Sequence, residues 1–184
     1  MEKIIRELLS EKRYNHSMAV AELARDLAHR LGEDPEKAYL AGVVHDIAKE
    51  ESHTRLLEIC EKNGISLTSV EKANPSLLHA PAGAAMLPDY GINDLEIQNA
   101  VRYHTVARAD MTNLEKIIYL ADMIEPSRDY KEVNELRQLA RTDFNEAFRR
   151  ALKYSIIWNL EKGRLIHEGT LQAWNSLLLK GETL

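Results

Sequence analysis

Cysteine is nearly absent from this sequence of 184 residues, which contains only Cys60. A single cysteine excludes an intrachain disulfide framework, and it also excludes a zinc site built on a CxxC pair. The lack of disulfides is compatible with a reducing cytosol, so we expect a cytoplasmic protein. Cys60 has apolar neighbours at helical spacing, and we expect it to be a small core residue.

Long apolar runs are also absent. No run approaches the roughly 18 residues that a membrane-spanning helix requires. The opening segment, MEKIIRELLSEKRYN, is charged throughout and lacks the apolar centre of a signal peptide. We therefore expect no membrane partner.

Positive charge is not in excess. Lys and Arg number 24 against 29 Asp and Glu, which gives a formal net charge of −5. This mild acidity argues against broad binding to nucleic acid. The length is that of one domain with a core of its own, so we expect a single domain over residues 1–184.

Alternating strand patterns are almost missing, and glycine and proline are sparse, at eight and five residues. Apolar residues recur instead at helical spacing, which predicts an all-α protein with nine or ten helices. The expected helices cover about residues 2–10, 15–31, 34–47, 52–62, 80–88, 93–104, 112–124 and 144–158, with a last one after Thr170.

Several polar residues occupy positions that helical spacing turns towards the core. They comprise four histidines and two aspartates: His16, His45, Asp46, His79, His104 and Asp122. An unpaired buried carboxylate is costly, so such groups are paired or coordinate a metal. Imidazole nitrogen and carboxylate oxygen together suit iron, manganese or zinc, which predicts a shared metal centre.

Each of these residues also has a simpler interpretation. A lone histidine on an apolar stripe is commonly a hydrogen-bonded core residue, and Asp122 could form a buried salt bridge with Arg13 or Arg102. The metal centre is favoured because the simpler explanation has to be repeated for every member of the set. The other histidines differ, since His29 and His53 lie among charged residues and are expected to be solvated. His167 is ambiguous.

The order His16, His45-Asp46, Asp122 resembles the H…HD…D signature of the HD-domain metal-dependent phosphohydrolases. His79 and His104 narrow the resemblance to members with two metals. The strings RYNHS, HDIAK, HAPAG, YHT and YLADMIEPSRDY resemble the YqeK-type proteins, and the likeness covers nearly the whole chain. It implies an HD domain with a metal-binding core over about residues 11–130 and additional C-terminal helices over about 131–184.

The resemblance further implies a bacterial symmetrical bis(5′-nucleosyl)-tetraphosphatase, which cleaves diadenosine tetraphosphate into two ADP through a metal-activated hydroxide. Two divalent or trivalent ions are expected, iron first and Mn, Co or Zn as alternatives. One ion is expected on His16, His45, Asp46 and Asp122 and the other on His79, His104 and the second oxygen of Asp46. Small HD proteins often pair, so a homodimer is left open.

The catalytic residues expected are Asp46 and Lys49, which helical spacing places on one face. Lys49 is also expected to contact the substrate, together with Thr105, Arg108 and Arg128; a surface charge is the simpler interpretation of each basic residue. Two further residues, Arg13 and Glu125, are expected to orient ligands. The large late aromatics are interpreted as packing residues, with Trp174 a candidate neighbour of a nucleobase: Phe144, Phe148, Trp158 and Trp174.

Two strings depart from the family's pattern, His104-Thr105-Val106-Ala107 where it has HTTG and His167-Glu168-Gly169-Thr170 where it has HP-x-T. The changed residues, Val106-Ala107 and Glu168-Gly169, lie outside the expected ligands and concern substrate contacts. Two alternatives stay open. One is an HD phosphohydrolase for another nucleotide, such as a nucleoside monophosphate, a dNTP, a cyclic dinucleotide or an alarmone. The other is a non-catalytic helical adaptor that binds a metal or nucleotide.

Overall fold

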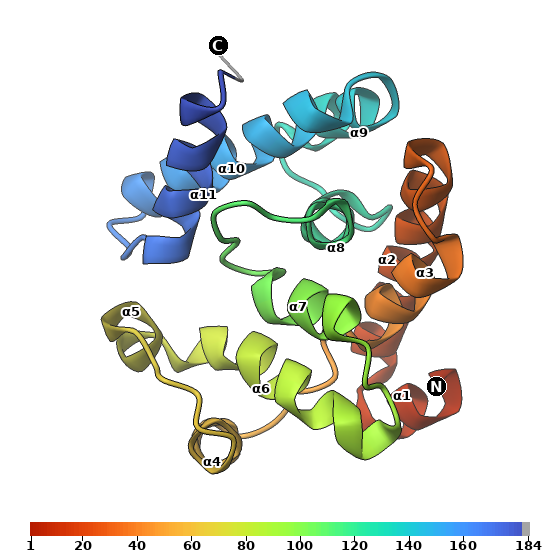
Figure 1. The fold of residues 1–184 in the computed structure, drawn as a ribbon, viewed down its shortest axis with the longest axis vertical. Coiled ribbons are helices and arrows are strands. Elements are labelled where there is room, and N and C mark those ends of the chain that lie inside the picture. Colours follow the sequence, from red (N-terminus) through yellow and green to blue (C-terminus); the bar gives the residue numbers. More distant parts are fainter. Residues whose placement is uncertain (182–184) are drawn as a thin grey trace.

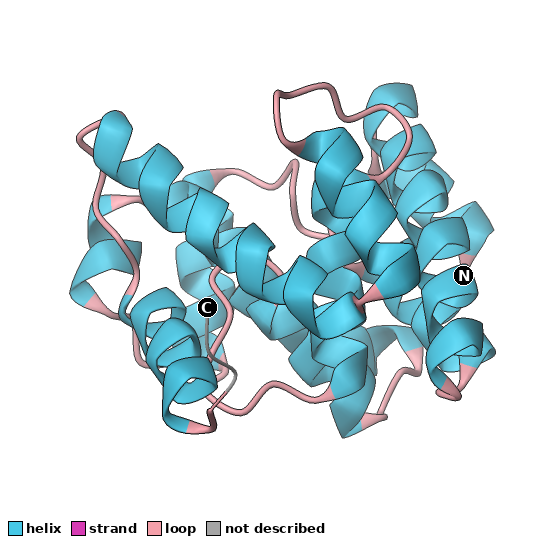
Figure 2. Ribbon diagram, turned by 90° about the horizontal axis from the view of Figure 1, so that it is seen from above, coloured by secondary structure: helices cyan, strands magenta, loops and turns pink. Residues whose placement is uncertain are grey.

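The computed structural model describes residues 1–181, which fold into helices with short connections and no strand (Figure 1, Figure 2). This confirms the all-α class. None of the helices in these residues could cross a membrane. The elements are α1 (Glu2–Leu8), α2 (Glu11–Leu31), α3 (Pro35–Val44), α4 (His53–Lys62), α5 (Ser69–Ala73), η1 (Pro75–Leu78), α6 (His79–Met86), η2 (Leu87–Tyr90), α7 (Leu95–Tyr103), α8 (Asn113–Ile124), α9 (Val133–Thr142), α10 (Phe144–Glu161) and α11 (Glu168–Leu179).

Side-chain caps start many of these helices. Asp34 accepts hydrogen bonds from the backbone amides of residues 36 and 37 just before Pro35 opens α3. Thr112 and Glu115 form a capping box at the start of α8, in which each side chain bonds the other's backbone amide. At the other end, Gly32 closes α2 in the left-handed conformation that glycine adopts without steric cost.

The helix count and several bounds differ from the expectation. Two elements, α5 and α9, were not expected, and α2 begins at Glu11 rather than at residue 15 because Ser10 caps it. The late helices are longer than expected, since α10 continues to Glu161 and α11 begins at Glu168. Within residues 1–181 the structure therefore has eleven α-helices, more than the nine or ten expected.

The end of α3 is a correction that matters for the site. This helix ends at Val44, whereas helical spacing suggested that it continued to Ile47. Nδ1 of His45 lies 2.7 Å from the Gly42 carbonyl oxygen. The His45 side chain therefore competes for a carbonyl that would accept a backbone hydrogen bond if the helix continued. The chain proceeds in turns, with the amide of Lys49 bonded to the Asp46 carbonyl at 2.9 Å.

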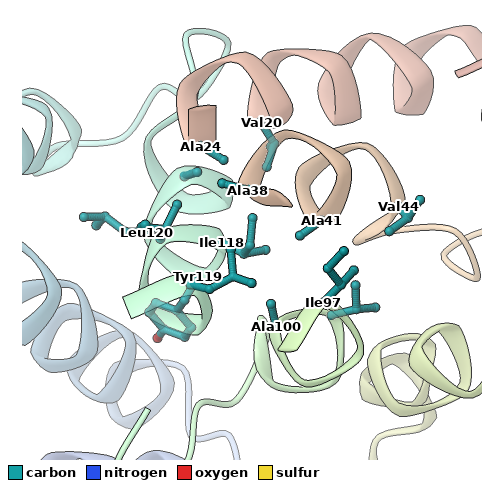
Figure 3. Close-up of a cluster of buried hydrophobic side chains, with 14 of the residues drawn as sticks. Val20, Ala24, Ala38, Ala41, Val44, Ile97, Ala100, Ile118, Tyr119 and Leu120 are labelled. Atoms are coloured by element: carbon teal, nitrogen blue, oxygen red, sulfur yellow. The ribbon is translucent and has the colours of Figure 1, made fainter. Parts of the chain in front are cut away.

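The core centres on α8, which Figure 1 shows end-on near the middle of the molecule. It packs against α2, α3, α7, α9 and α10. Apolar side chains of α2, α3, α7 and α8 meet in one cluster, including Val20, Ala41, Ile97 and Ile118 (Figure 3).

Helices α2 and α3 approach closely because Gly42 lacks a side chain. A Cβ at that position would lie 2.5 Å from the Cα of Ala21. Buried apolar residues from Ile5 to Leu177 belong to one hydrophobic cluster, the arrangement expected of one domain. The division into a core and added C-terminal helices stays a prediction, and residues 182–184 lie outside the described residues.

Candidate metal centre

The fold brings all six expected ligand residues into one buried cluster. They come from separate segments: His16 from α2, His45 and Asp46 from the turns after α3, His79 from the first position of α6, His104 from the residue after α7, and Asp122 from α8. His45 and Asp46 are 0% and 2% exposed. Four of the six residues therefore lie at or beside helix ends, and the other two, His16 and Asp122, lie within helices.

Asp46 lies between two pairs of histidines. Its Oδ2 is 3.8 Å from Nε2 of His16 and 3.5 Å from Nε2 of His45. Its Oδ1 is 3.2 Å from Nε2 of His79 and 3.5 Å from Nε2 of His104. The two oxygens of one carboxylate thus face different histidine pairs, which is the arrangement that a bridging carboxylate adopts between two ions.

Asp122 completes the first half of the cluster. Its Oδ1 lies 3.0 Å from Nε2 of His16, yet that nitrogen has no hydrogen-bond partner. Within the described residues, Nε2 of His45 and Oδ1 of Asp46 are also buried without a partner. Buried polar atoms normally have a hydrogen-bond partner. These unpartnered atoms are therefore suited to act as ligands of a cation.

The spacing of these atoms also fits a metal. Two clusters, His16 with His45 and Asp122 and His45 with Asp46 and His104, each offer ligand atoms within 4.8 Å of one another. Donors that sit about 2 Å from one ion lie roughly 3 to 3.5 Å apart, close to the separations found here. The cluster is suited to divalent metal binding, and its donors are those of catalytic rather than thiolate structural sites.

Each histidine is oriented through its other ring nitrogen. Nδ1 of His45, His79 and His104 lies 2.6 to 2.7 Å from the backbone carbonyl three residues earlier. Nδ1 of His16 lies 3.1 Å from Oε1 of the fully buried Glu125. These contacts place the proton on Nδ1 and leave the Nε2 lone pair facing the cluster, as metal-ligating histidines require.

Burial and mutual contacts set the protonation of the cluster. Burial lowers the pKa of His45 to about 4 and also lowers the pKa of His79, so both imidazoles are neutral at pH 7. Burial alone would raise the pKa of Asp46 and Asp122, but the facing imidazoles, and Arg128 at Asp122, outweigh it and lower both values. Neutral imidazoles and ionised carboxylates are the forms that bind metals.

Three cationic side chains border the cluster. Nη1 of Arg13 donates to Oδ2 of Asp46 at 2.8 Å, and Arg128 donates to the Asp122 carboxylate. Nζ of Lys49 is 3.1 Å from Nε2 of His79, and burial lowers the pKa of this lysine. The partner of Asp122 is thus Arg128 rather than Arg13 or Arg102, whose guanidinium lies over the Tyr103 ring.

Two cavities reach the cluster. We call the first the α2 cavity; it measures about 950 Å³ and its walls include Lys12, Arg13, His16, Glu125 and Arg128. We call the second the α10 cavity; it measures about 580 Å³ and is lined by Lys49, His104, Thr105, Tyr119, Asp122, Met123, Tyr130, Glu132, Tyr154, Ser155 and Trp158. Both volumes lie in the range of small-molecule sites.

Three of the four residues expected to contact the substrate line one of these cavities, and the fourth lines neither. Lys49 and Thr105 line the α10 cavity, where Oγ1 of Thr105 is buried without a hydrogen-bond partner. Arg128 lines the α2 cavity. Arg108 lies elsewhere: Nη2 donates to Oε1 of the buried Glu115 at 2.8 Å. The structure therefore pairs Arg108, in the segment between α7 and α8, with Glu115 of α8, and Arg108 lines neither cavity.

The remaining aromatic and histidine residues need one correction. Trp158, interpreted from its spacing as a packing residue, is 47% exposed and lines the α10 cavity. Phe148 is buried against Tyr119, as expected, and Cys60 is a buried core residue. His29 and His53 are exposed. No signal in the helical periodicity could have separated Trp158 from the buried residues of its stripe.

The ambiguous His167 has a structural role. It caps α11, where its Nδ1 accepts a hydrogen bond from the Gly169 amide at 2.9 Å. The two strings that depart from the family pattern meet here, since Oγ1 of Thr170 donates to the Val106 carbonyl at 2.7 Å. A Cβ on Gly169 would lie 2.6 Å from the Ala107 carbonyl oxygen. The departures therefore belong to one contact between α11 and the segment after His104.

Known proteins resemble this chain over nearly all of its length. Residues 13–127 match the HD domain family. A protein of Bacillus subtilis named symmetrical bis(5′-nucleosyl)-tetraphosphatase is 37% identical over 95% of this chain and 94% of its own. A protein of the same name from Halalkalibacterium halodurans is 38% identical over 97% of this chain and 95% of its own.

A solved structure agrees with the sequence comparisons. A crystal structure from Clostridium acetobutylicum, described as a predicted HD superfamily hydrolase involved in NAD metabolism, is 40% identical and superposes with a TM-score of 0.94. The superposition covers 97% of this chain and 95% of the other. The histidine and aspartate cluster, the helical fold and these likenesses agree: the chain belongs to the HD-domain family of hydrolases, in the group of the symmetrical bis(5′-nucleosyl)-tetraphosphatases.

Proposed function

We propose that this chain hydrolyses diadenosine tetraphosphate symmetrically into two ADP with two metal ions, iron in the first place. The observation that carries the proposal is the position of Asp46, whose two oxygens face two different histidine pairs. A one-metal site would not need the second pair. The relatives from B. subtilis and H. halodurans are named for this activity, which supports the choice of substrate.

The proposed ligands are those expected from the sequence: His16, His45, Asp46 and Asp122 for one ion and Asp46, His79 and His104 for the other. Ions bound there would polarise phosphate oxygens and lower the pKa of a bound water. The two oxygens of the Asp46 carboxylate would each serve one of the two ions and so fix their relative positions. Glu125 and the backbone carbonyls would keep the imidazoles turned inward.

The chain's cations would hold the phosphates. Lys49 and Thr105 border the cluster on the side of the α10 cavity and Arg128 on the side of the α2 cavity. The three nearby carboxylates of Asp46, Asp122 and Glu125 are matched by three cations, Arg13, Lys49 and Arg128. Two bound ions would make this centre locally positive in a chain of formal charge −5, which suits a short polyphosphate.

The two cavities would accommodate the two halves of the substrate. His16 lines the α2 cavity, whereas His104 and Asp122 line the α10 cavity, so both open onto the cluster. A tetraphosphate lying across the cluster would place its central bridging oxygen over the centre and extend one half into each cavity. Attack of water on the phosphorus next to that oxygen would break the bond between the two atoms and release two molecules of ADP.

Metal analysis and product chromatography test the proposal together. We expect about two metals per chain, with iron in the protein as isolated, and release of ADP alone from diadenosine tetraphosphate. The Asp46→Asn variant should lose metal and turnover, while the matched variant Asp89→Asn, at an exposed carboxylate, should keep both. Release of AMP and ATP overturns symmetrical cleavage, and faster hydrolysis of another nucleotide in a substrate panel overturns the proposed substrate.

The association state belongs to the same set of experiments. The resemblance leaves a homodimer open, and this stays a prediction that sedimentation or light scattering of the metal-loaded protein would test. A monomer would leave the proposed chemistry intact, because every proposed ligand comes from one chain.

A further inference from the structure

Aromatic side chains form much of the lining of the α10 cavity. Three of the seven tyrosines, Tyr119, Tyr130 and Tyr154, line this cavity together with Trp158, one of two tryptophans. The same cavity is bordered by Lys49, His104 and Asp122. Ring surfaces and the cluster thus share one space, which is the composition of a site for a molecule with a flat base and a charged tail.

Two of the tyrosine hydroxyls in this lining are already bonded to the protein. The Tyr130 hydroxyl donates to the Met123 carbonyl at 3.0 Å, and the Tyr154 hydroxyl donates to Oε2 of Glu135 at 2.7 Å. Since these hydroxyls are bonded to the protein, the rings are held in place and their contribution to the cavity is surface area. Such a wall recognises a ligand by stacking rather than by hydrogen bonds.

Trp158 offers the largest of these surfaces. The guanidinium of Arg164 lies over one side of the indole, 4.4 Å from the ring centroid, yet the residue remains 47% exposed. Burial of a tryptophan contributes more to stability than burial of most side chains, so an indole that is half exposed beside a cavity is poorly explained by packing. Arg164 lies against one part of the indole, and the exposed part of this side chain borders the cavity.

The α2 cavity has a different composition. Among the described residues that line it, Tyr130 is the one tyrosine or tryptophan, and this residue borders the α10 cavity as well. Six charged side chains line the α2 cavity, the cations Lys12, Arg13 and Arg128 and the carboxylates Glu11, Glu125 and Asp129. The two cavities therefore differ in kind although the proposed substrate has two identical halves. Tyrosine and tryptophan rings predominate in the α10 cavity, and charged side chains of both signs predominate in the α2 cavity.

From this difference we propose that the α10 cavity binds one nucleoside of the substrate, with its base stacked on Trp158 and its phosphates directed at Lys49 and Thr105. The other half of the substrate lies along the α2 cavity, where the cations Lys12, Arg13 and Arg128 contact its phosphates. This inference rests on the proposed function for the identity of the ligand. It assigns Trp158 as the residue that anchors the nucleoside.

The two tryptophans allow a direct test by fluorescence. Trp174 packs against the hydrophobic core, so the Trp174→Phe variant leaves Trp158 as the single emitter, and Trp158→Phe leaves only Trp174. Metal-loaded protein of each variant is titrated with ADP, with excitation at the red edge of tryptophan absorption where ADP does not absorb. We expect saturable quenching in Trp174→Phe and no change in Trp158→Phe. Quenching only of Trp174, or of neither, overturns the proposal.

Kinetics give the second readout. Stacking of a base on an aromatic side chain is worth roughly 5- to 150-fold in affinity, so Trp158→Ala should raise the KM for diadenosine tetraphosphate about tenfold or more. Leu95→Ala, at an exposed side chain outside both cavities, should leave KM unchanged. An unchanged KM in Trp158→Ala, with turnover intact, overturns the nucleoside site but leaves the proposed function. Quenching of Trp158 by ADP without any hydrolysis of diadenosine tetraphosphate overturns the proposed function but leaves the nucleoside site.

Discussion

Oε1 of Glu125 lies 3.1 Å from Nδ1 of His16, although the two residues are 109 positions apart in the sequence. Glu125 is 0% exposed and also accepts hydrogen bonds from the amide and hydroxyl of Ser127. A carboxylate held in this way fixes both the tautomer and the direction of the imidazole. The residue directly after α8 thereby orients a proposed ligand on α2.

Replacement of Glu125 should weaken metal binding without removing a ligand. Loss of such an orienting partner typically costs 10- to 100-fold in metal affinity, and we expect a rise of about that size in the metal dissociation constant of Glu125→Ala. Competition with a coloured chelator measures it. Glu125→Gln keeps an oxygen acceptor and should recover part of the affinity, whereas wild-type affinity in Glu125→Ala contradicts the orienting role.

The second histidine pair should determine how many ions are bound. His79 and His104 face Oδ1 of Asp46 and lie 3.2 Å from each other between their Nε2 atoms. His79→Ala or His104→Ala is therefore expected to lower the metal content from about two ions to about one and to reduce turnover severely. Elemental analysis of the purified variants gives the ratio, with His29→Ala, at an exposed histidine, as the matched control. Near wild-type turnover in both variants would instead indicate an HD phosphohydrolase that uses one metal.

Arg108 should matter for stability rather than for substrate binding. Its guanidinium is the ion-pair partner of Glu115, which is 0% exposed and also accepts from the Thr112 amide. Arg108→Ala leaves a buried carboxylate without its cation, which should lower the free energy of unfolding by about 2 kcal/mol. Urea unfolding measures the loss, and the KM for diadenosine tetraphosphate should not change.

A double variant provides the control for this prediction. Removal of both charges is less costly than removal of one, so Arg108→Ala with Glu115→Gln should be more stable than Arg108→Ala alone. The glutamine oxygen can still accept from the Thr112 amide. A raised KM with unchanged stability in the Arg108→Ala variant would contradict this prediction and indicate that Arg108 contacts the substrate.

The sequence predicted the cluster because each member interrupts an apolar stripe. His16 shares the stripe of Val20, and Asp122 interrupts the apolar run of α8. Both patterns indicated inward positions, and the structure brings the residues together. Which oxygen of Asp46 faces which histidine depends on how α3, α6 and α7 end in space, and no spacing within one helix contains that information.

The errors have local physical causes. Helical spacing carried α3 past Val44 because it takes no account of the His45 side chain, which bonds the Gly42 carbonyl. On α10 the stripe that holds the buried Phe148 continues to Trp158, but Trp158 is 47% exposed. Periodicity predicts a face, whereas burial depends on what packs against it.

The two departures from the family pattern show a further limit. Residues 104–107 and 167–170 are far apart in the sequence, and each was assigned separately to substrate contacts. In the structure Thr170 bonds the carbonyl of Val106, and His167 caps α11. Changes that are distant along a chain can belong to one packing contact, which only the fold shows.

Acid should destabilise the metal-free protein in a window set by histidine. Burial lowers the pKa of His45 to about 4 from an ordinary value of 6.5, so the unfolded chain binds this proton first as the pH falls. The stability contributed by neutral His45 is therefore complete above pH 6.5 and decreases as the pH approaches 4, by up to about 3 kcal/mol, with His79 acting in the same direction. Denaturant unfolding with chelator present, at steps between these values, measures the slope. His45→Asn should flatten it and His29→Asn should not, and a metal-free wild type whose stability is flat across this range contradicts the prediction.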